Sequence, residues 1–495
     1  MSTEKIDIVC NLDYDVIIIG AGISGIGFAY RLKQSNPDLT YAILETRHEI
    51  GGTWSYFCYP GIRSDSDFYT FSFPWKPYIK DQAIAKGLLI KDYLNEAITE
   101  QGIDGHIEFN HRVNSLNWSS TTNTWTLDIT ATTAIGQTQR TLSSRFVMLG
   151  SGYYDYNIPL KADIPGIENF EGKVIHPQFW PKDYDYTNKN VVIVGSGATA
   201  ITLVPTMAEK AAHVTMLQRS PTWIVARGNN NLFDHILIAL LPKTFAFYVL
   251  RLKWALVGWF LVWFCLRFPV SARKLLLADT KKQLPDGMDL TPDFTPEYNP
   301  WAQRMCLSPD GDFYQAIRSG KANIVTDHIG TVTATSINLK SGDQLNPDVI
   351  VTATGLRTVI GGKIAITVDG ERLHIPDLYS WKCSMLEGLP NLFYTFGYLD
   401  ASWTMGADAT ARLAARMIRQ LRRDGKKVLI PTRTEREKAT MKEVPYLRMK
   451  STYLKSGLCY MPKAGDARQW MPRSDFITDA MDSWWGDIRS SIEWR

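Results

Sequence analysis

Two glycine-rich turns constrain the fold of this chain, because each follows a short apolar run and opens a segment of helical character. The first run is Asp15–Ile19, and the second is the sequence NVVIV at residues 190–194. The turn positions are Gly20, Gly22 and Gly25 in the first case and Gly195, Gly197, Thr199 and Ala200 in the second. In such a turn one glycine permits the tight bend, another lets a phosphate reach the backbone, and a small residue lets the helix pack on the strand. The sequence therefore predicts an α/β fold with two Rossmann-like dinucleotide-binding domains.

A charged residue follows the second strand of each predicted domain. Glu45 follows the strand Leu39–Leu44, 25 residues after the first turn glycine, and Arg219 follows His213–Leu217, 24 residues after the second. A carboxylate at this place accepts the two ribose hydroxyls, whereas an arginine pairs with a 2′-phosphate. We therefore expect FAD in the first domain and NADPH, held by Arg219 with Ser220, in the second. The alternative for Arg219 is an exposed arginine in an ordinary loop.

Pattern and composition divide the chain into five predicted segments. Residues 1–152 and 386–495 form the FAD-binding domain, the second of them with a C-terminal tail, and residues 153–227 and 301–385 form the NADP-binding domain. Residues 228–300 form a helical, apolar insert in the NADP-binding domain.

Further elements follow from periodicity. A helix is expected over 89–101, followed by a small antiparallel sheet from Ile107–Trp118, Thr124–Thr130 and Arg140–Leu149. Later we expect a single strand over Thr331–Asn338, a polar turn over Asp400–Gly406 and an amphipathic helix over Asp408–Arg423. The strand Asp348–Thr352 ends in a small-residue turn with Thr354 and Gly355, where the chain can pass close to a dinucleotide. An ordinary strand end is the alternative there.

Composition excludes several classes of partner and reaction. The formal net charge is +4 over 495 residues, which gives no case for nucleic acid. The six cysteines are scattered without a CxxC pair or metal-type spacing, so we expect no metal, reduced thiols and a cytoplasmic protein. A reductase with two Rossmann domains usually needs a redox-active cysteine pair or another acceptor. Oxygen is therefore the expected electron acceptor.

The insert is the most apolar part of the chain. Asp234–Leu241 and Phe245–Leu266 are rich in apolar and aromatic residues, but the uninterrupted apolar run is only Trp254–Leu266, shorter than the about 20 residues of a membrane span. A single span would also separate the two parts of the NADP-binding domain. We expect peripheral contact of residues 234–268 with the inner face of a membrane. A buried helical subdomain that walls a substrate pocket is the alternative.

Two motifs resemble those of a known family. The segment FEGKVIHPQFWP matches the fingerprint of Baeyer–Villiger flavin monooxygenases through Phe170, Gly172, His176, Trp180 and Pro181. The flavin-containing monooxygenases that oxidise nitrogen and sulfur lack the final Trp-Pro. A second family motif matches through Gly52, Trp54, Tyr59, Pro60, Gly61 and Asp65. The length, the KSGD…ATGL region and the apolar insert resemble the ethionamide-monooxygenase subgroup most.

The resemblance implies a mechanism and site residues. In the family, NADPH reduces FAD, and oxygen then forms a C4a-peroxyflavin that converts an apolar ketone to an ester or lactone. Arg304 matches the arginine that stabilises the peroxide, and Asp65 matches the acid that holds this arginine. The segment with Gly52, Trp54 and Tyr59 is expected at the flavin, and His176 resembles a hinge residue. Gln303 stands where many relatives have a lysine, so NADPH preference depends on Arg219 and Ser220.

Three other functions are compatible with the same pattern. The scaffold could oxygenate sulfur or nitrogen, act as an NADPH oxidase or reductase, or serve as a membrane-associated redox sensor without catalysis. Retention of both Asp65 and Arg304 argues against the sensor, and an ordinary structural ion pair is the alternative role for these two residues.

Overall fold

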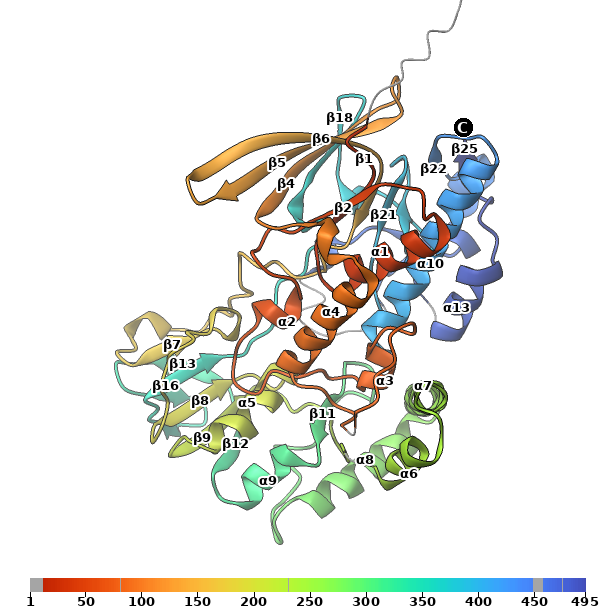
Figure 1. Cartoon of the computed structure of the whole chain (residues 1–495). Coiled ribbons are helices and arrows are strands. Elements are labelled where there is room, and N and C mark those ends of the chain that lie inside the picture. Colours follow the sequence, from red (N-terminus) through yellow and green to blue (C-terminus); the bar gives the residue numbers. More distant parts are fainter. Residues whose placement is uncertain (1–11, 81, 230, 448–456, 474) are drawn as a thin grey trace, which may run out of the picture.

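The first nucleotide turn lies between strand β1 (Tyr14–Ile19) and helix α1 (Ile23–Ser35), as the glycine spacing predicts. The computed structural model describes residues 12–80, 82–229, 231–447, 457–473 and 475–495 (Figure 1). Strand β1 is almost wholly buried and pairs in parallel with β2 (Tyr41–Leu44) and β6 (Gly136–Leu149). The same sheet continues through β4 (His111–Ser119) and β5 (Thr124–Thr133), which form the expected antiparallel layer, and ends on the other side at β3 (Ile107–Glu108). Helix α4 (Gly87–Gln101) matches the helix expected over 89–101.

The second nucleotide turn lies in a separate parallel sheet. Its five strands are ordered β12-β9-β8-β16-β7, and helix α5 (Ala198–Ala208) follows the turn. The strands are β7 (Lys173–Ile175), β8 (Asn190–Val194), β9 (His213–Gln218), β12 (Ala322–Thr326) and β16 (Val349–Thr352). Edge strand β7 lies inside the fingerprint segment. The α/β class with two Rossmann-like sheets is confirmed.

The prediction of a single strand over Thr331–Asn338 is wrong. This stretch is a hairpin of β13 (Ile329–Val332) and β14 (Ile337–Leu339), extended by β15 (Gln344–Leu345). The Thr333 amide donates to the Ser336 carbonyl, and the two side-chain hydroxyls also hydrogen-bond. Val332 and Ala334 alternate with threonines into this turn, so the pattern did not mark where the first strand ended.

The insert forms three helices at the end of the molecule opposite strands β4 to β6 (Figure 1). These are α6 (Leu232–Leu240), α7 (Lys243–Arg267) and α8 (Pro269–Gln283). Within the described residues, α7 alone is long and apolar enough to cross a membrane by length and composition. The apolar run Trp254–Leu266 expected from the sequence is shorter than α7, because it ends at the cations on either side of it. Strands β10 (Ile224–Arg227) and β11 (Cys306–Pro309), on either side of the insert, pair in parallel. The chain therefore leaves the domain from β10 and rejoins it at the neighbouring strand β11.

The C-terminal part returns to the first sheet, and here one expected domain boundary is corrected. Strand β17 (Ala365–Val368) pairs with β4 and with β18 (Glu371–Leu373), so these residues lie in the first sheet and not in the NADP-binding part expected over 301–385. Strands β19 (Ser380–Trp381), β20 (Met385–Leu386) and β21 (Leu392–Tyr394) join the same sheet beside β6. Further segments are α3 (Phe68–Phe71), α9 (Asp312–Arg318), α11 (Glu435–Thr440), α13 (Phe476–Trp485), β22 (Leu429–Pro431), β23 (Glu443–Val444), β24 (Ala464–Gly465) and β25 (Ile492–Trp494).

Helix α10 (Trp403–Arg423) starts within the stretch expected to be a polar turn, Asp400–Gly406, so only the first residues of that stretch form a turn. Its buried face packs against α1. The Arg31 side chain joins the two helices through hydrogen bonds of 2.7 Å and 3.1 Å to both carboxylate oxygens of Asp408. Burial alone would raise the pKa of Asp408, but the cations of Arg31 and Arg412 outweigh it and lower the pKa. This pair fixes α10 behind the first nucleotide turn.

Candidate active site

The first turn is shaped by close approaches of the backbone. A Cβ atom on Gly25 would lie 2.0 Å from the Gly20 carbonyl oxygen, so a larger residue would push α1 away from the turn. Gly22 faces Gly52 at the start of α2 (Thr53–Tyr56), and both border a cavity of about 320 Å³. We name this space the nucleotide cavity. It also contacts Gly20 and Glu45, whereas Gly25 serves only packing.

Glu45 lies buried at the end of β2, where the strand pattern placed it. Its carboxylate accepts the backbone N–H of Ala21 at 2.7 Å and that of Arg47 at 3.0 Å, one on each oxygen. Burial raises the pKa of Glu45, and these two donors lower it part of the way back. Each oxygen retains a lone pair that can accept a hydroxyl hydrogen bond.

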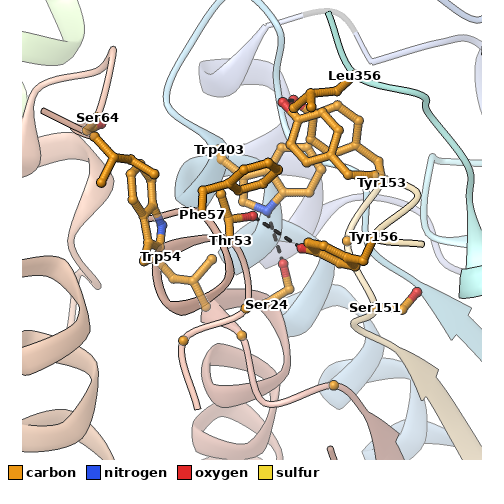
Figure 2. A pocket seen from close by; sticks show the side chains of 18 of the residues that line it. Ser24, Thr53, Trp54, Phe57, Ser64, Ser151, Tyr153, Tyr156, Leu356 and Trp403 are labelled. Carbon is orange, nitrogen blue, oxygen red and sulfur yellow. Dashed lines mark hydrogen bonds between the residues drawn. The ribbon is translucent and has the colours of Figure 1, made fainter. Parts of the chain in front are cut away.

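Aromatic rings form one part of the wall of the nucleotide cavity. Figure 2 shows Phe57, Tyr153, Tyr156 and Trp403 gathered together, with Trp54 apart from them. The Tyr153 and Trp403 rings stack with centroids 4.8 Å apart, and Trp403 Nε1 donates to Ser24 Oγ at 3.0 Å (Figure 2). These contacts leave flat apolar surfaces around the turn, which suit a planar ring system.

Sequence reasoning had missed several of these wall residues. Tyr153 and Tyr156 lie just after β6, at the start of the segment 153–227 that was expected in the NADP-binding domain. The signal was present as the tyrosine cluster directly after the glycines at the carboxyl end of a parallel strand, where ligands bind.

Arg304 and Asp65 lie next to each other, although 239 positions separate them in the sequence. An Arg304 side-chain nitrogen donates to Asp65 Oδ1 at 2.8 Å, with Arg304 just before β11 and Asp65 in the loop after α2. The pair borders the nucleotide cavity and a second cavity of about 670 Å³, which we name the apolar cavity. The walls of the apolar cavity come from α7, the loop 399–402, the start of α10 and the start of α13. A cation is therefore held where the two cavities meet.

The loop that carries Asp65 also contacts the second domain. The hydroxyl of Tyr59 hydrogen-bonds that of Thr199 on α5, and burial raises the pKa of Tyr59 to about 12, so this hydroxyl stays protonated at neutral pH. Gly61 lies against α5, and Arg63 forms an ion pair with Asp312 at the start of α9. Trp54, Tyr59, Asp65 and Thr199 thus border one cavity together with the first turn.

The second nucleotide turn lies at the edge of this arrangement. An added Cβ on Gly195 would meet the Ala353 carbonyl oxygen at 2.3 Å, whereas Gly197 faces open space. Ser196 Oγ donates to the Ser220 carbonyl at 3.1 Å, and the neighbouring Arg219 is exposed. Thr354 and Gly355 follow β16 as expected, and Ala200 is buried in the domain core. Arg219, Ser220, Gly195, Gly197, Thr354 and Gly355 do not border the nucleotide cavity.

The fingerprint residues have structural positions between the second sheet and the cavity. Phe170 and Trp180 are buried, and Gly172 leaves no room for a side chain beside Phe170. His176 Nδ1 accepts the backbone N–H of Gln178 at 3.2 Å. Burial lowers the pKa of His176, and a backbone hydrogen bond with Leu160 raises it part of the way back. His176 does not border the nucleotide cavity, but Pro177 and Gln178 do.

Comparison with known proteins gives relatives over nearly the whole chain. A family model described as pyridine nucleotide-disulphide oxidoreductase matches residues 17–232. The FAD-containing monooxygenase EthA of Mycobacterium tuberculosis is 42% identical over 469 residues, 94% of each chain. Cys58, Cys265, Cys306 and Cys383 are free cysteines, and Cys10 lies outside the described part of the chain.

Solved structures share the fold at lower identity. A structure of OTEMO with FAD and NADP has a TM-score of 0.73 at 19% identity and covers 98% of this chain and all of its own. Cyclohexanone monooxygenase with bound epsilon-caprolactone has a TM-score of 0.73 at 18% identity, over 97% of this chain and 99% of its own.

Proposed function

This chain belongs to the family of FAD-containing monooxygenases, and from that premise we propose that it oxidises an apolar ketone to an ester or lactone with NADPH and oxygen. One oxygen atom enters the bond between the carbonyl carbon and its neighbour, and the other leaves as water with the electrons of NADPH. The observation that carries the proposal is the Arg304–Asp65 pair where the nucleotide and apolar cavities meet.

The residues present fit both cofactors. The Gly20–Gly25 turn would hold the pyrophosphate of FAD, Glu45 would accept its ribose hydroxyls, and the flat aromatic walls would enclose its ring. The open space at Gly197 suits the pyrophosphate of NADPH. Arg219 and Ser220, joined to this turn by the Ser196–Ser220 hydrogen bond, would take its 2′-phosphate. Bound FAD supplies the redox and oxygen chemistry, and NADPH supplies the electrons.

The side chains of this protein would then control charge and water. The Arg304 guanidinium stabilises negative charge that develops between the two cavities, and Asp65 orients it through the 2.8 Å contact. Phe57, Tyr153 and Trp403 exclude water from the nucleotide cavity, which strengthens that charge interaction. Neutral His176, outside the cavity wall, would transmit movement between the second sheet and Gln178.

Rapid-scan absorbance with product analysis tests this proposal. The FAD-loaded protein is reduced with NADPH without oxygen and then mixed with oxygenated buffer. We expect a lasting absorbance that belongs to neither reduced nor oxidised flavin, and ester formation when a ketone is added. Immediate return to oxidised flavin with stoichiometric hydrogen peroxide would instead identify an oxidase or reductase. Oxygenation of a sulfide panel but no ketone would identify a sulfur oxygenase.

The location proposed for this enzyme is the cytoplasm, with peripheral contact of residues 234–268 with the inner face of a membrane. The exposed apolar residues of α6 and α7 support this contact.

A further inference from the structure

Helix α7 presents an unbroken row of apolar side chains to the solvent. The row consists of Phe245, Tyr248, Leu252, Leu256, Trp259, Trp263 and Leu266, each at least 40% exposed. Successive members are three or four positions apart, so they lie along one face of the helix. We name this row the α7 stripe. Exposed apolar surface of this extent marks an interaction site.

Other side chains of α7 form hydrogen bonds with the rest of the protein. Arg251 donates to the carbonyls of Tyr69 and Ser72 at 2.6 Å and 2.8 Å, and Trp254 Nε1 donates to Asp234 at 2.9 Å. These contacts hold the helix flat on the surface. They bind the first half of α7 to the protein on one side, so the other side is left for contact with a membrane surface.

The charged side chains along α7 and the start of α8 all have one sign. No acidic residue occurs between Asp234 and Asp279, whereas Lys243, Arg267 and Lys274 are exposed in that interval. Tryptophans beside cations are the composition of a helix that lies at a membrane interface. An anionic lipid surface complements this face. A two-fold pair of copies through the stripe would instead bring cations against cations.

The α7 stripe also borders the apolar cavity. Trp259, Trp263 and Leu266 are exposed and at the same time form part of the cavity wall, so the cavity reaches the surface at the stripe. Arg304 and Asp65 border the same cavity. One space therefore connects the exposed apolar surface with the candidate catalytic pair.

We propose that the α7 stripe rests in the headgroup layer of an anionic membrane and that the apolar substrate passes from the lipid along α7 to Arg304. The second half rests on the proposed function, since it concerns the route of that substrate. The surface contact does not rest on it.

Vesicle sedimentation of the FAD-loaded full chain tests the surface. We expect binding to phosphatidylcholine vesicles that contain phosphatidylglycerol, and weaker binding to phosphatidylcholine alone. The double change L252E/L256E places charges in the stripe at residues that do not border the cavity. It should weaken binding roughly tenfold or more. The matched control is I135E, because Ile135 is 96% exposed in the turn between β5 and β6; it should bind like the wild type.

The route is tested by presenting one long-chain methyl ketone in two ways. In anionic vesicles, L252E/L256E should lose roughly tenfold in turnover, in step with its binding. With the ketone delivered by cyclodextrin, wild type and variant should be equal. Equal turnover in vesicles despite lost binding would overturn the route.

Two results would overturn the surface contact. One is wild-type protein that does not sediment with anionic vesicles, and the other is a dimer, measured by light scattering, that L252E/L256E dissociates. Absence of ketone turnover in both formats with intact vesicle binding would reject the proposed function and the route but not the membrane surface.

Discussion

At the scale of single residues, the Arg304–Asp65 pair is better explained by chemistry than by stability. The two side chains are 24% and 38% exposed. An ion pair in contact with water contributes little to folding, about 0–1 kcal/mol. Holding one cation between two cavities has an evident use in charge stabilisation, whereas its contribution to folding is small.

Replacement of Arg304 by alanine should separate NADPH oxidation from oxygenation. Loss of one charge-stabilising group lowers the catalysed step roughly 10²–10³-fold. We expect flavin reduction by NADPH to persist, with hydrogen peroxide in place of the ester. Ester and peroxide are measured in the same reaction. R422A, which removes an exposed arginine paired with Asp38, is the control and should stay coupled. Coupled oxygenation by R304A would remove Arg304 from the mechanism.

Arg219 is the residue on which the choice of nicotinamide cofactor should depend. A guanidinium that binds a phosphate contributes about 1.5–3 kcal/mol. R219A should therefore lower the preference for NADPH over NADH roughly 10- to 100-fold, mainly through the KM for NADPH. Steady-state kinetics with NADPH and NADH measures this preference. R422A, at an exposed arginine, is again the control. An unchanged preference would assign Arg219 to an ordinary exposed loop.

At the scale of elements, the loop that carries Asp65 depends on its contact with α5. Gly61 has a φ of +76°, and a Cβ there would lie 2.1 Å from Thr206 Oγ1 on that helix. The loop can keep its place only with glycine at this position. Asp65, four positions later, therefore owes its position to the contact between two domains.

G61A should shift this loop and reduce coupling of NADPH oxidation to product, at a loss of about 1 kcal/mol or more in stability. T206A is the control and should stay coupled. The double variant G61A/T206A should recover coupling only in part. Removal of the Thr206 side chain relieves the clash, but the backbone strain at residue 61 remains. Full coupling in G61A would show that the position of Asp65 does not depend on this contact.

The α1–α10 pair is held by a buried ion pair whose removal should be costly. D408N leaves the Arg31 guanidinium buried without its carboxylate, which costs about 3–5 kcal/mol. Denaturant unfolding at a fixed FAD concentration measures the effect. D38N is a matched control, because Asp38 pairs with Arg422 of the same helix at the surface, and it should cause no measurable change. Equal effects of D38N and D408N would contradict the role of burial.

At the scale of the whole molecule, the fingerprint segment joins the second sheet to the cavity that lies against the first. Strand β7 belongs to the second sheet, and Gln178, two residues after His176, borders the nucleotide cavity. Gln178 Nε2 also donates to the Asp155 carbonyl at 2.8 Å. A change in the charge of His176 therefore affects the link between the two domains.

The stability of the protein should fall in mild acid because of His176. Its pKa is lowered in the folded state, so below about pH 6.5 the unfolded chain binds the proton more readily. Stability is complete above this pH and decreases as the pH falls towards the folded-state pKa. Melting temperatures of FAD-loaded H176Q should change less with pH than those of wild type. H328Q, at an exposed histidine, should keep the wild-type slope; equal slopes in all three would contradict the prediction.

The sequence alone determined the two Rossmann-like sheets, their turns and the charged residues after the second strands. These features depend on local conditions: an apolar strand, a backbone bend and a helix packed directly on it. Glu45 and the Gly20–Gly25 turn could therefore be placed from their immediate neighbours. The motif resemblance supplied the pairing of Asp65 with Arg304, which no local pattern carries.

The tertiary structure decided what depends on contacts between distant segments. It brought β17 and β18 into the first sheet and gathered Phe57, Tyr153 and Trp403 into one wall. It also placed exposed apolar side chains of α7 on the wall of a cavity. Sequence periodicity reports which side chains avoid water, but not whether a neighbouring segment, a ligand or a lipid covers them. Which of these covers a given side chain depends on the arrangement of the whole folded chain.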